Sequence, residues 1–161
     1  MTREIERLKD QLRRSFDGEA WHGPAVLEAL AGVAADQAAA HPLAGAHSIW
    51  ELVLHLAGTY RIVLRRLGGD AAPLSPEDDW PPPPASTPES WRHSVEMLRR
   101  LNQDVRRALA AFSPDRLDDP LVADPPYTAY THFIGITQHD CYHAGQIAIL
   151  KRALRPRTHN E

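Results

Sequence analysis

The sequence predicts an all-α protein that folds as a single four-helix bundle. Four stretches repeat apolar side chains every three or four positions, which is the spacing of one helix face. They are residues 2–16, 49–67, 88–112 and 128–154. No stretch alternates apolar and polar residues for long enough to indicate a strand. The 161 residues, 43% of them hydrophobic, suffice for one core and are too few for two domains of usual size, so we expect one domain over residues 1–161.

The first long helix is expected to begin at a capping residue, Thr2, and to end at Asp17-Gly18. Its apolar face consists of Ile5, Leu8, Leu12 and Phe16. Beyond this helix, Pro24 suits the first position of another, and apolar residues continue into an alanine-rich stretch near Asp36. We expect one or two short extra helices there, ending at His41-Pro42.

The second long helix has a well-marked start and end. Ser48 is the expected cap, Glu51 three residues later completes a capping box, and Gly68-Gly69 stops the helix. His55 lies within the apolar stripe of this helix. An imidazole among leucines is either a hydrogen-bonded core residue or a ligand, and His55 taken alone favours the core residue.

A proline-rich connection separates the second and third long helices. Seven of the 14 prolines lie between Pro73 and Pro88, and proline continues neither a helix interior nor a central strand. An extended crossover of this length allows consecutive helices of a bundle to run parallel. Trp80 is expected to pack this crossover onto the body, or else to line the mouth of a pocket. The third helix should follow a cap at Thr87, and the fourth should begin near Thr128.

Two histidines stand four residues apart in the fourth helix, at His139 and His143. Such a pair is offset by only about 40° around the helix axis, so both imidazoles leave the same face and can chelate one ion. Gln146 and His132, seven residues to either side of His139, lie nearly in line with it and are placed to reach the same pocket. Cys141 lies on the far side of the helix and cannot share the ion.

A third ligand is needed for a firm transition-metal site. If four helices bury their stripes around one axis, His55 comes near the His139 pair, and one divalent ion satisfies three nitrogens that would otherwise be buried separately. The alternative is that the four-residue spacing of His139 and His143 arises by chance and that no metal binds there. Gly135, one turn before His139, leaves room for a ligand or for a tightly packed neighbouring helix. The remaining histidines that we considered are expected at the surface: His22, His41 and His93.

These features together resemble the DinB-like (DNA-damage-inducible) superfamily of metal-binding four-helix bundles. The resemblance rests on Ser48-Ile49-Trp50 with His55-Leu56, on the crossover around Trp80, and on His139 and His143 followed by Gly145-Gln146-Ile147. It implies an up-down-down-up bundle, often dimeric, with one metal on His55, His139 and His143. Some members are thiol S-transferases or isomerases that use bacillithiol, mycothiol or glutathione, and many have no established activity.

The chemistry of three imidazoles points to an enzyme. Such a centre keeps open positions, as catalytic zinc sites do, and can activate a thiol or a water. Zinc and nickel are the expected ions, although nitrogen sites also accept copper, iron and manganese. Glu51, one turn before His55, and Gln146 are candidate catalytic residues, and helix capping is the alternative for Glu51. The leading function is a low-molecular-weight-thiol S-transferase. A metal-dependent hydrolase and a noncatalytic metal-binding stress-response bundle are the alternatives.

The composition of the chain limits the classes of molecule that it is expected to bind. The net charge of −3 and the absence of a long Lys/Arg run argue against nucleic acid. No segment has the apolar length of a membrane span or a secretion signal, so we expect a cytoplasmic protein that is not embedded in a membrane. One cysteine excludes a disulfide framework. We expect a small-molecule substrate and a homodimer that uses small apolar surfaces around Ala35 to Ala40 and the second helix.

Overall fold

A computed structural model describes residues 3–155 of the chain, and their regular structure is helical apart from one isolated bridge between Pro120 and Thr128. The long helices are α1 (Arg3–Phe16), α4 (Ile49–Leu67), α6 (Pro88–Ala111) and α7 (Ala129–Ala153). The short ones are α2 (Val26–Leu30), α3 (Ala35–Ala39), α5 (Pro76–Asp79) and the 3-10 turn η1 (Pro114–Arg116). The all-α prediction is confirmed.

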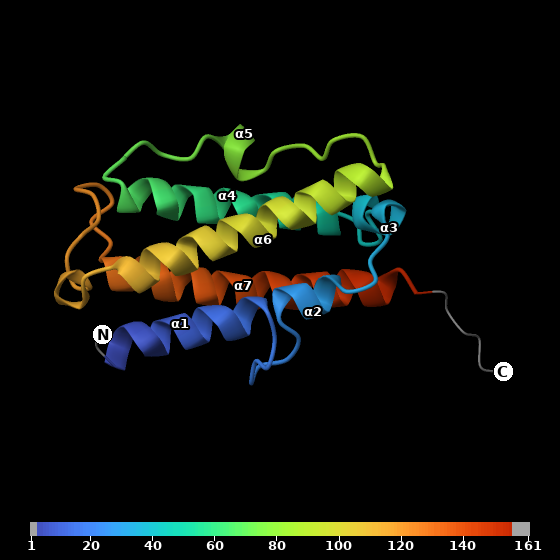
Figure 1. The fold of residues 1–161 in the computed structure, drawn as a ribbon. Coiled ribbons are helices and arrows are strands. Elements are labelled where there is room, and N and C mark those ends of the chain that lie inside the picture. Colours follow the sequence, from blue (N-terminus) through green and yellow to red (C-terminus); the bar gives the residue numbers. More distant parts are fainter. Residues whose placement is uncertain (1–2, 156–161) are drawn as a thin grey trace.

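The four long helices form a bundle with up-down-down-up topology. In Figure 1, α1 and α7 run in one direction, and α4 and α6 run in the other. Both α1 and α4 pack against α6 and against α7. The crossover between α4 and α6 carries α5 along the outside of α4, which is why two consecutive long helices can run parallel (Figure 1). Short helices α2 and α3 close one end of the bundle against α7 and α4.

The predicted helix starts agree with the caps in the structure. Ser48 Oγ accepts a hydrogen bond from the backbone N–H of Glu51, and the Glu51 carboxylate accepts one from the backbone N–H of Ser48. The hydroxyl oxygens of Thr87 and Thr128 cap α6 and α7 by accepting from the backbone N–H of the residue three positions later. The predicted cap Thr2 lies outside the described residues.

Two local predictions differ from the structure. Helix α2 begins at Val26 and not at Pro24, because the Glu28 carboxylate accepts from the backbone N–H of Ala25 and so makes Ala25 the cap. The crossover is not extended throughout, since it contains α5. Ser75 caps that helix and Pro76 takes its first position, a start signal that the density of prolines obscured.

Part of the alanine-rich stretch that we expected at a dimer surface is buried within the chain itself. Ala35 and Ala38 of α3 are buried within the chain's own core, where α3 packs against α4 and α6. Small side chains suit this position because they let a short helix approach two long ones closely. Ala39 and Ala40 are half-buried, and the homodimer through them and the second helix stays a prediction.

One polar group from each long helix meets in the middle of the apolar core. Asp140 of α7 accepts hydrogen bonds from the hydroxyl groups of Tyr60 on α4 (2.7 Å) and Ser15 on α1 (3.0 Å). Asn102 of α6 donates to the Tyr60 oxygen at 3.3 Å. Burial raises the pKa of Asp140 to about 7, against the opposing effect of the two hydroxyl donors. This cluster fixes how far α7 is rotated about its own axis, and hence where its histidines lie.

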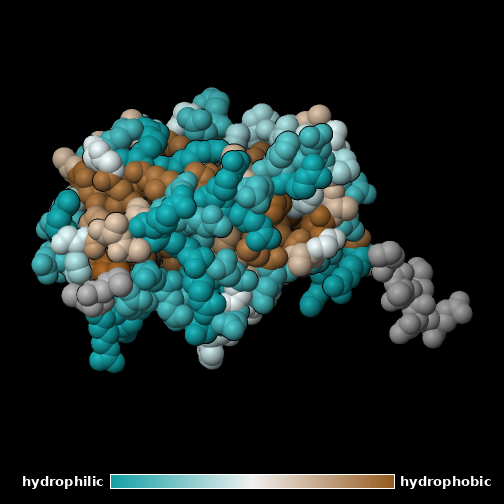
Figure 2. Space-filling model, in the orientation of Figure 1, coloured by the Kyte–Doolittle hydropathy of each residue, from teal (hydrophilic) through white to brown (hydrophobic). Residues whose placement is uncertain are grey.

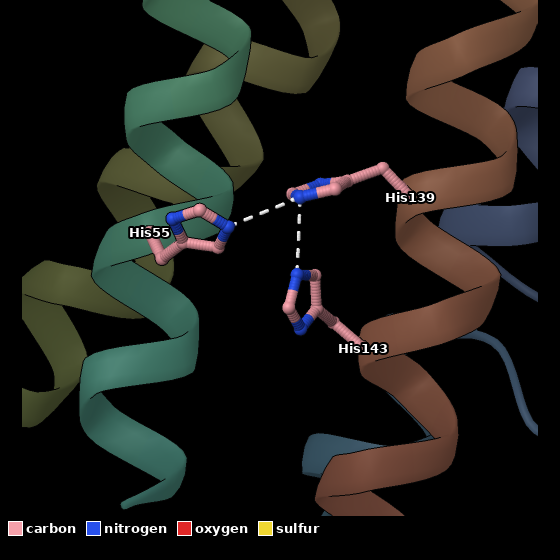
Figure 3. A group of neighbouring side chains, drawn as sticks. All are labelled: His55, His139 and His143. Atoms are coloured by element: carbon pink, nitrogen blue, oxygen red, sulfur yellow. Dashed lines mark hydrogen bonds between the residues drawn. The ribbon is translucent and has the colours of Figure 1, made fainter. Parts of the chain in front are cut away.

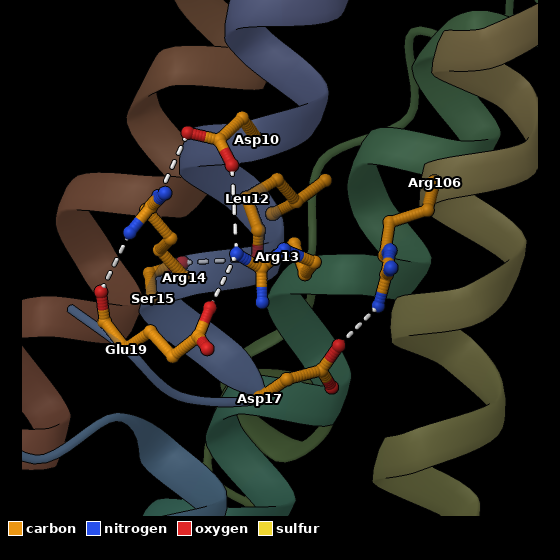
Figure 4. Close-up of polar contacts among 8 residues, drawn as sticks. All are labelled: Asp10, Leu12, Arg13, Arg14, Ser15, Asp17, Glu19 and Arg106. Atoms are coloured by element: carbon orange, nitrogen blue, oxygen red, sulfur yellow. Dashed lines mark hydrogen bonds and ion pairs between the residues drawn. The ribbon is translucent and has the colours of Figure 1, made fainter.

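Ion pairs hold the end of α1 and the turn that follows it (Figure 4). Arg14 pairs with Asp10, Arg13 pairs with Glu19, and Arg106 of α6 pairs with Asp17 at 2.7 Å. The first two pairs are local, and the third joins α6 to the residue that follows α1. Exposed pairs of this kind contribute little to stability. The apolar contacts, not these pairs, hold α1 in the bundle.

The surface is mixed in character. On the face shown in Figure 2, hydrophilic side chains surround separate patches of hydrophobic ones. Within residues 3–155, no helix combines the length and the apolar character needed to cross a membrane.

Candidate metal centre

Helices α4 and α7 bring three histidines together in the core (Figure 3). The Nε2 atom of His139 lies 3.1 Å from Nε2 of His55 and 3.0 Å from Nε2 of His143. These ligand atoms all lie within 4.8 Å of one another, so this group could hold a metal ion. Two nitrogens bound tetrahedrally at about 2.0–2.1 Å from one ion stand about 3.3 Å apart, which is close to the observed spacing.

The ring of His55 is held from the crossover. Its Nδ1 atom lies 2.9 Å from the main-chain oxygen of Asp79 and 3.0 Å from a carboxylate oxygen of the same residue. Both are acceptors, so Nδ1 carries the proton and Nε2 turns its lone pair toward the other histidines. Trp80 stacks on the same ring, with centroids 4.0 Å apart and planes 3° apart. Trp80 thus packs the crossover onto the body and also borders the site.

His143 is oriented in the same way by its own helix. Its Nδ1 atom donates to the side-chain oxygen of Gln146 at 2.6 Å, so its Nε2 atom also presents a lone pair. His139 differs from the other two. Its Nδ1 is buried and has no hydrogen-bond partner among the described residues. Burial, together with the neighbouring His143 and His55, lowers the pKa of His139 to about 3. Burial likewise lowers the pKa of His143.

Burial favours the neutral form of the two imidazoles on α7, because it lowers the pKa of both His139 and His143. A protonated imidazole cannot bind a metal ion, because the proton occupies the lone pair that the ion needs. The histidines of α7 are therefore ready to act as ligands at neutral pH without first losing a proton.

A family model for the DinB superfamily matches residues 20–147. The chain belongs to the DinB superfamily. Searches of curated proteins and of solved structures found no match. The family match includes His55, His139 and His143, together with the crossover that orients the first of them.

Glu51 plays a capping role in this DinB-superfamily structure. Besides its contact with Ser48, its carboxylate lies 2.9 Å from Nε2 of the exposed His41. Burial raises the pKa of Glu51, but the hydrogen bonds from Ser48 and His41 outweigh it, and the net pKa is lowered. Among the described residues, no hydrogen bond or ion pair joins the Glu51 carboxylate to any of the three histidines. The catalytic role of Glu51, like that of Gln146, stays a prediction.

Asp79 is the residue that the sequence did not reveal. We expected a carboxylate beside His55 to come from its own helix, at Glu51, because that spacing can be counted along the chain. Asp79 instead reaches His55 from a connection 24 residues away. The only sequence signal was the capped Ser75-Pro76 start of α5, which indicates a short helix ending just before Trp80.

The other candidates lie apart from the metal centre. Cys141 points away from it, as the helical wheel predicted, and its sulfur lies 3.6 Å from Nδ1 of the exposed His22. His132 does not belong to the histidine group; it packs edge-on against Tyr127. A β-carbon at Gly135 would meet nothing within 4 Å, so a tightly packed neighbouring helix is not the reason for that glycine. His93 is exposed, as predicted.

Proposed function

We propose that this chain is a metal-dependent enzyme whose ion, zinc or nickel, binds Nε2 of His55, His139 and His143. The observation that carries the proposal is that His55 and His143 each have an acceptor at Nδ1 while their Nε2 atoms both approach Nε2 of His139. With Nδ1 of both His55 and His143 protonated, their Nε2 atoms both present lone pairs to His139. A neutral His139 can donate its one Nε2 proton to only one of them. The other contact then sets two lone pairs about 3 Å apart, and a divalent cation removes that repulsion.

The chain's own residues prepare the site for catalysis. Asp79 and Gln146 fix the rings of His55 and His143, so little reorganisation is needed when an ion binds. When bound, a divalent ion on three neutral imidazoles keeps open positions and acidifies a thiol or a water there. Trp80 covers one face of His55 and keeps solvent from that side.

The reaction that we assign is the addition of a low-molecular-weight thiol to a small electrophile. The thiol releases its proton to solvent and its sulfur forms a bond to the electrophilic carbon. In an addition the π electron pair of the electrophile then takes up a proton, and in a substitution the leaving group departs with its electron pair. A free thiol ionises near pH ~8.5 and water only near ~15.7, so the thiol needs less help from a base. This supports thiol chemistry here, because the carboxylates of Glu51 and Asp79 are already engaged.

The test uses protein without a polyhistidine tag. Elemental analysis should find about one zinc or nickel per chain, and glutathione should be consumed with chlorodinitrobenzene as the electrophile. Chelation and His139→Ala should both abolish this activity, whereas Cys141→Ser should retain it. Hydrolysis of esters or amides without any thiol would replace the proposal with a hydrolase. Full metal occupancy without turnover in either assay would leave the noncatalytic metal-binding alternative.

A further inference from the structure

Exposed large apolar side chains gather at one place beside the metal centre. The described chain has six of them, and three surround a single hollow of about 470 Å³. Those three are Leu43, Tyr142 and Ile149, which are 40%, 65% and 61% exposed. Leaving such side chains in water is unfavourable, and grouping them around a concavity is typical of a binding site. The volume lies within the ordinary range for small-molecule pockets.

The hollow adjoins the proposed metal ligands. His143 and its partner Gln146 line it, and so does Trp80, whose indole stacks on His55. His47 forms another part of the wall and stacks on Trp80, with centroids 3.6 Å apart and planes 10° apart. A molecule in the hollow would therefore lie against the residues that hold the ion.

The side chains that line the hollow favour uncharged groups of a bound molecule over charged ones. No Asp, Glu, Lys or Arg is among the described residues that line the hollow. The polar side chains are His47, Tyr142, His143 and Gln146, and the remaining wall is apolar or backbone. In the metal-free protein, a charged group placed there would lose water without gaining a side chain of opposite charge from the lining, whereas an apolar group gains about 25 cal/mol for each Å² it buries.

We propose that this hollow binds an uncharged substrate through an aromatic or branched alkyl group, which lies against Tyr142 and Ile149. The reactive part of the molecule then faces His143. The assignment of this molecule as the electrophile rests on the proposed function, but its binding does not. A charged thiol such as glutathione finds no ionic partner in the lining and is not the occupant. A second copy of the chain is the competing occupant, and the experiment distinguishes it.

The experiment measures binding of a neutral fluorescent probe, N-phenylnaphthylamine, to metal-free and metal-loaded protein. Tyr142→Ser and Ile149→Ser should each weaken binding about tenfold, which corresponds to the loss of one apolar contact surface. Tyr130→Ser is the matched control, since Tyr130 is an exposed tyrosine of the same helix that does not line the hollow. Anilinonaphthalene sulfonate, the anionic relative of the probe, should bind to the metal-free protein at least tenfold more weakly than the neutral probe.

Two results would overturn this proposal. One is equal probe affinity in the wild type, both pocket variants and the control. The other is a wild-type dimer that Tyr142→Ser and Ile149→Ser convert to monomer in sedimentation while Tyr130→Ser does not, which would make the surface an interface between copies. Because probe binding needs neither thiol nor turnover, its loss in the pocket variants supports the hollow even if no enzymatic activity is found. If the protein is enzymatically active but the pocket variants bind the probe as tightly as the wild type, the proposed activity stands and the hollow is not a binding site.

Discussion

The backbone of Asp78 in α5 lies against Gly58 of α4, so closely that a β-carbon at Gly58 would be 2.9 Å from the Asp78 carbonyl oxygen. The absence of a side chain at Gly58 lets α5 rest directly on α4. The next residue after Asp78 is Asp79, which holds the ring of His55 one turn away from the glycine. A glycine that is not a ligand therefore determines how a ligand is oriented.

Gly58→Ala should weaken metal binding without removing a ligand. The added methyl group forces α5 to move, since backbone cannot give way as a flexible side chain can, and Asp79 moves with it. We expect a loss in affinity of about tenfold in a competition titration with a fluorescent chelator. Gly145→Ala is the matched control, because a β-carbon there meets nothing within 4 Å. Equal affinities for both variants would show that α5 does not position His55.

Asp79→Ala tests the carboxylate itself. The main-chain oxygen of Asp79 still accepts from His55, so one of two acceptors is lost and the metal should remain bound, about 10-fold more weakly. The fold should be unaffected because the Asp79 side chain is 39% exposed. Glu77→Ala, at an exposed acidic residue of the same short helix, should leave affinity unchanged. Identical losses in both variants would indicate a general charge effect and not a contact with His55.

Substituting a metal ligand should reduce metal binding more than substituting a residue that orients the ligand. His55→Ala and His139→Ala should each abolish stoichiometric metal binding, measured by elemental analysis after gel filtration. Circular dichroism should stay helical, since the apolar stripes of the four long helices are unchanged. Cys141→Ser should keep its metal, because the Cys141 sulfur faces His22. Retention of metal by the His55 variant, or its loss from the serine variant, would contradict the assigned ligand set.

The sequence predicted the long helices and the His139–His143 pair because both depend on periodic spacing, whereas the resemblance to the DinB superfamily implied that His55 joins the pair. Apolar residues that repeat every 3.6 positions identify long helices, and two histidines at that spacing lie on the same face of their helix. The supporting shell could not be predicted in this way. Asp79 and Trp80 come from the crossover, where no periodicity relates position to orientation, and their contact with His55 depends on how α5 packs on α4. The hollow beside His143 likewise combines α7 with the loop before α4.

Tyr60→Phe should destabilise the fold by about 1–3 kcal/mol, since it leaves the buried Asp140 with one hydroxyl donor in place of two. For a chain of this size, that corresponds to a fall in Tm of roughly 2–4 °C per kcal/mol. Thermal unfolding of metal-free protein measures it. Tyr130→Phe, at a partly exposed tyrosine, should change Tm little. Equal Tm values for the two variants would show that the Asp140 cluster contributes little to stability.

The last prediction concerns the metal-free protein at acid pH. Burial lowers the pKa of His139 to about 3, whereas a histidine in the unfolded chain titrates near ~6.5. Between these values the unfolded state binds a proton that the folded state does not, so His139 contributes stability above pH ~6.5 that is lost as the pH falls toward 3. Asp140 acts in the opposite sense, because its raised pKa of about 7 makes the folded state hold a proton that the unfolded state releases above ~3.9.

A comparison with His139→Ala isolates the histidine, because Asp140 is present in both proteins. In a chelating buffer, the free energy of unfolding of the wild type should fall relative to that of the variant as the pH is lowered from 7 to 5. Urea titrations at each pH measure the difference. His93→Ala, at an exposed histidine of α6, provides the matched control for substitution of a histidine outside the metal centre. A His139→Ala difference that stays constant with pH would mean that the imidazole of His139 takes up its proton as readily in the folded core as in the unfolded chain, and the site would then have to compete with protons for its metal at pH 6.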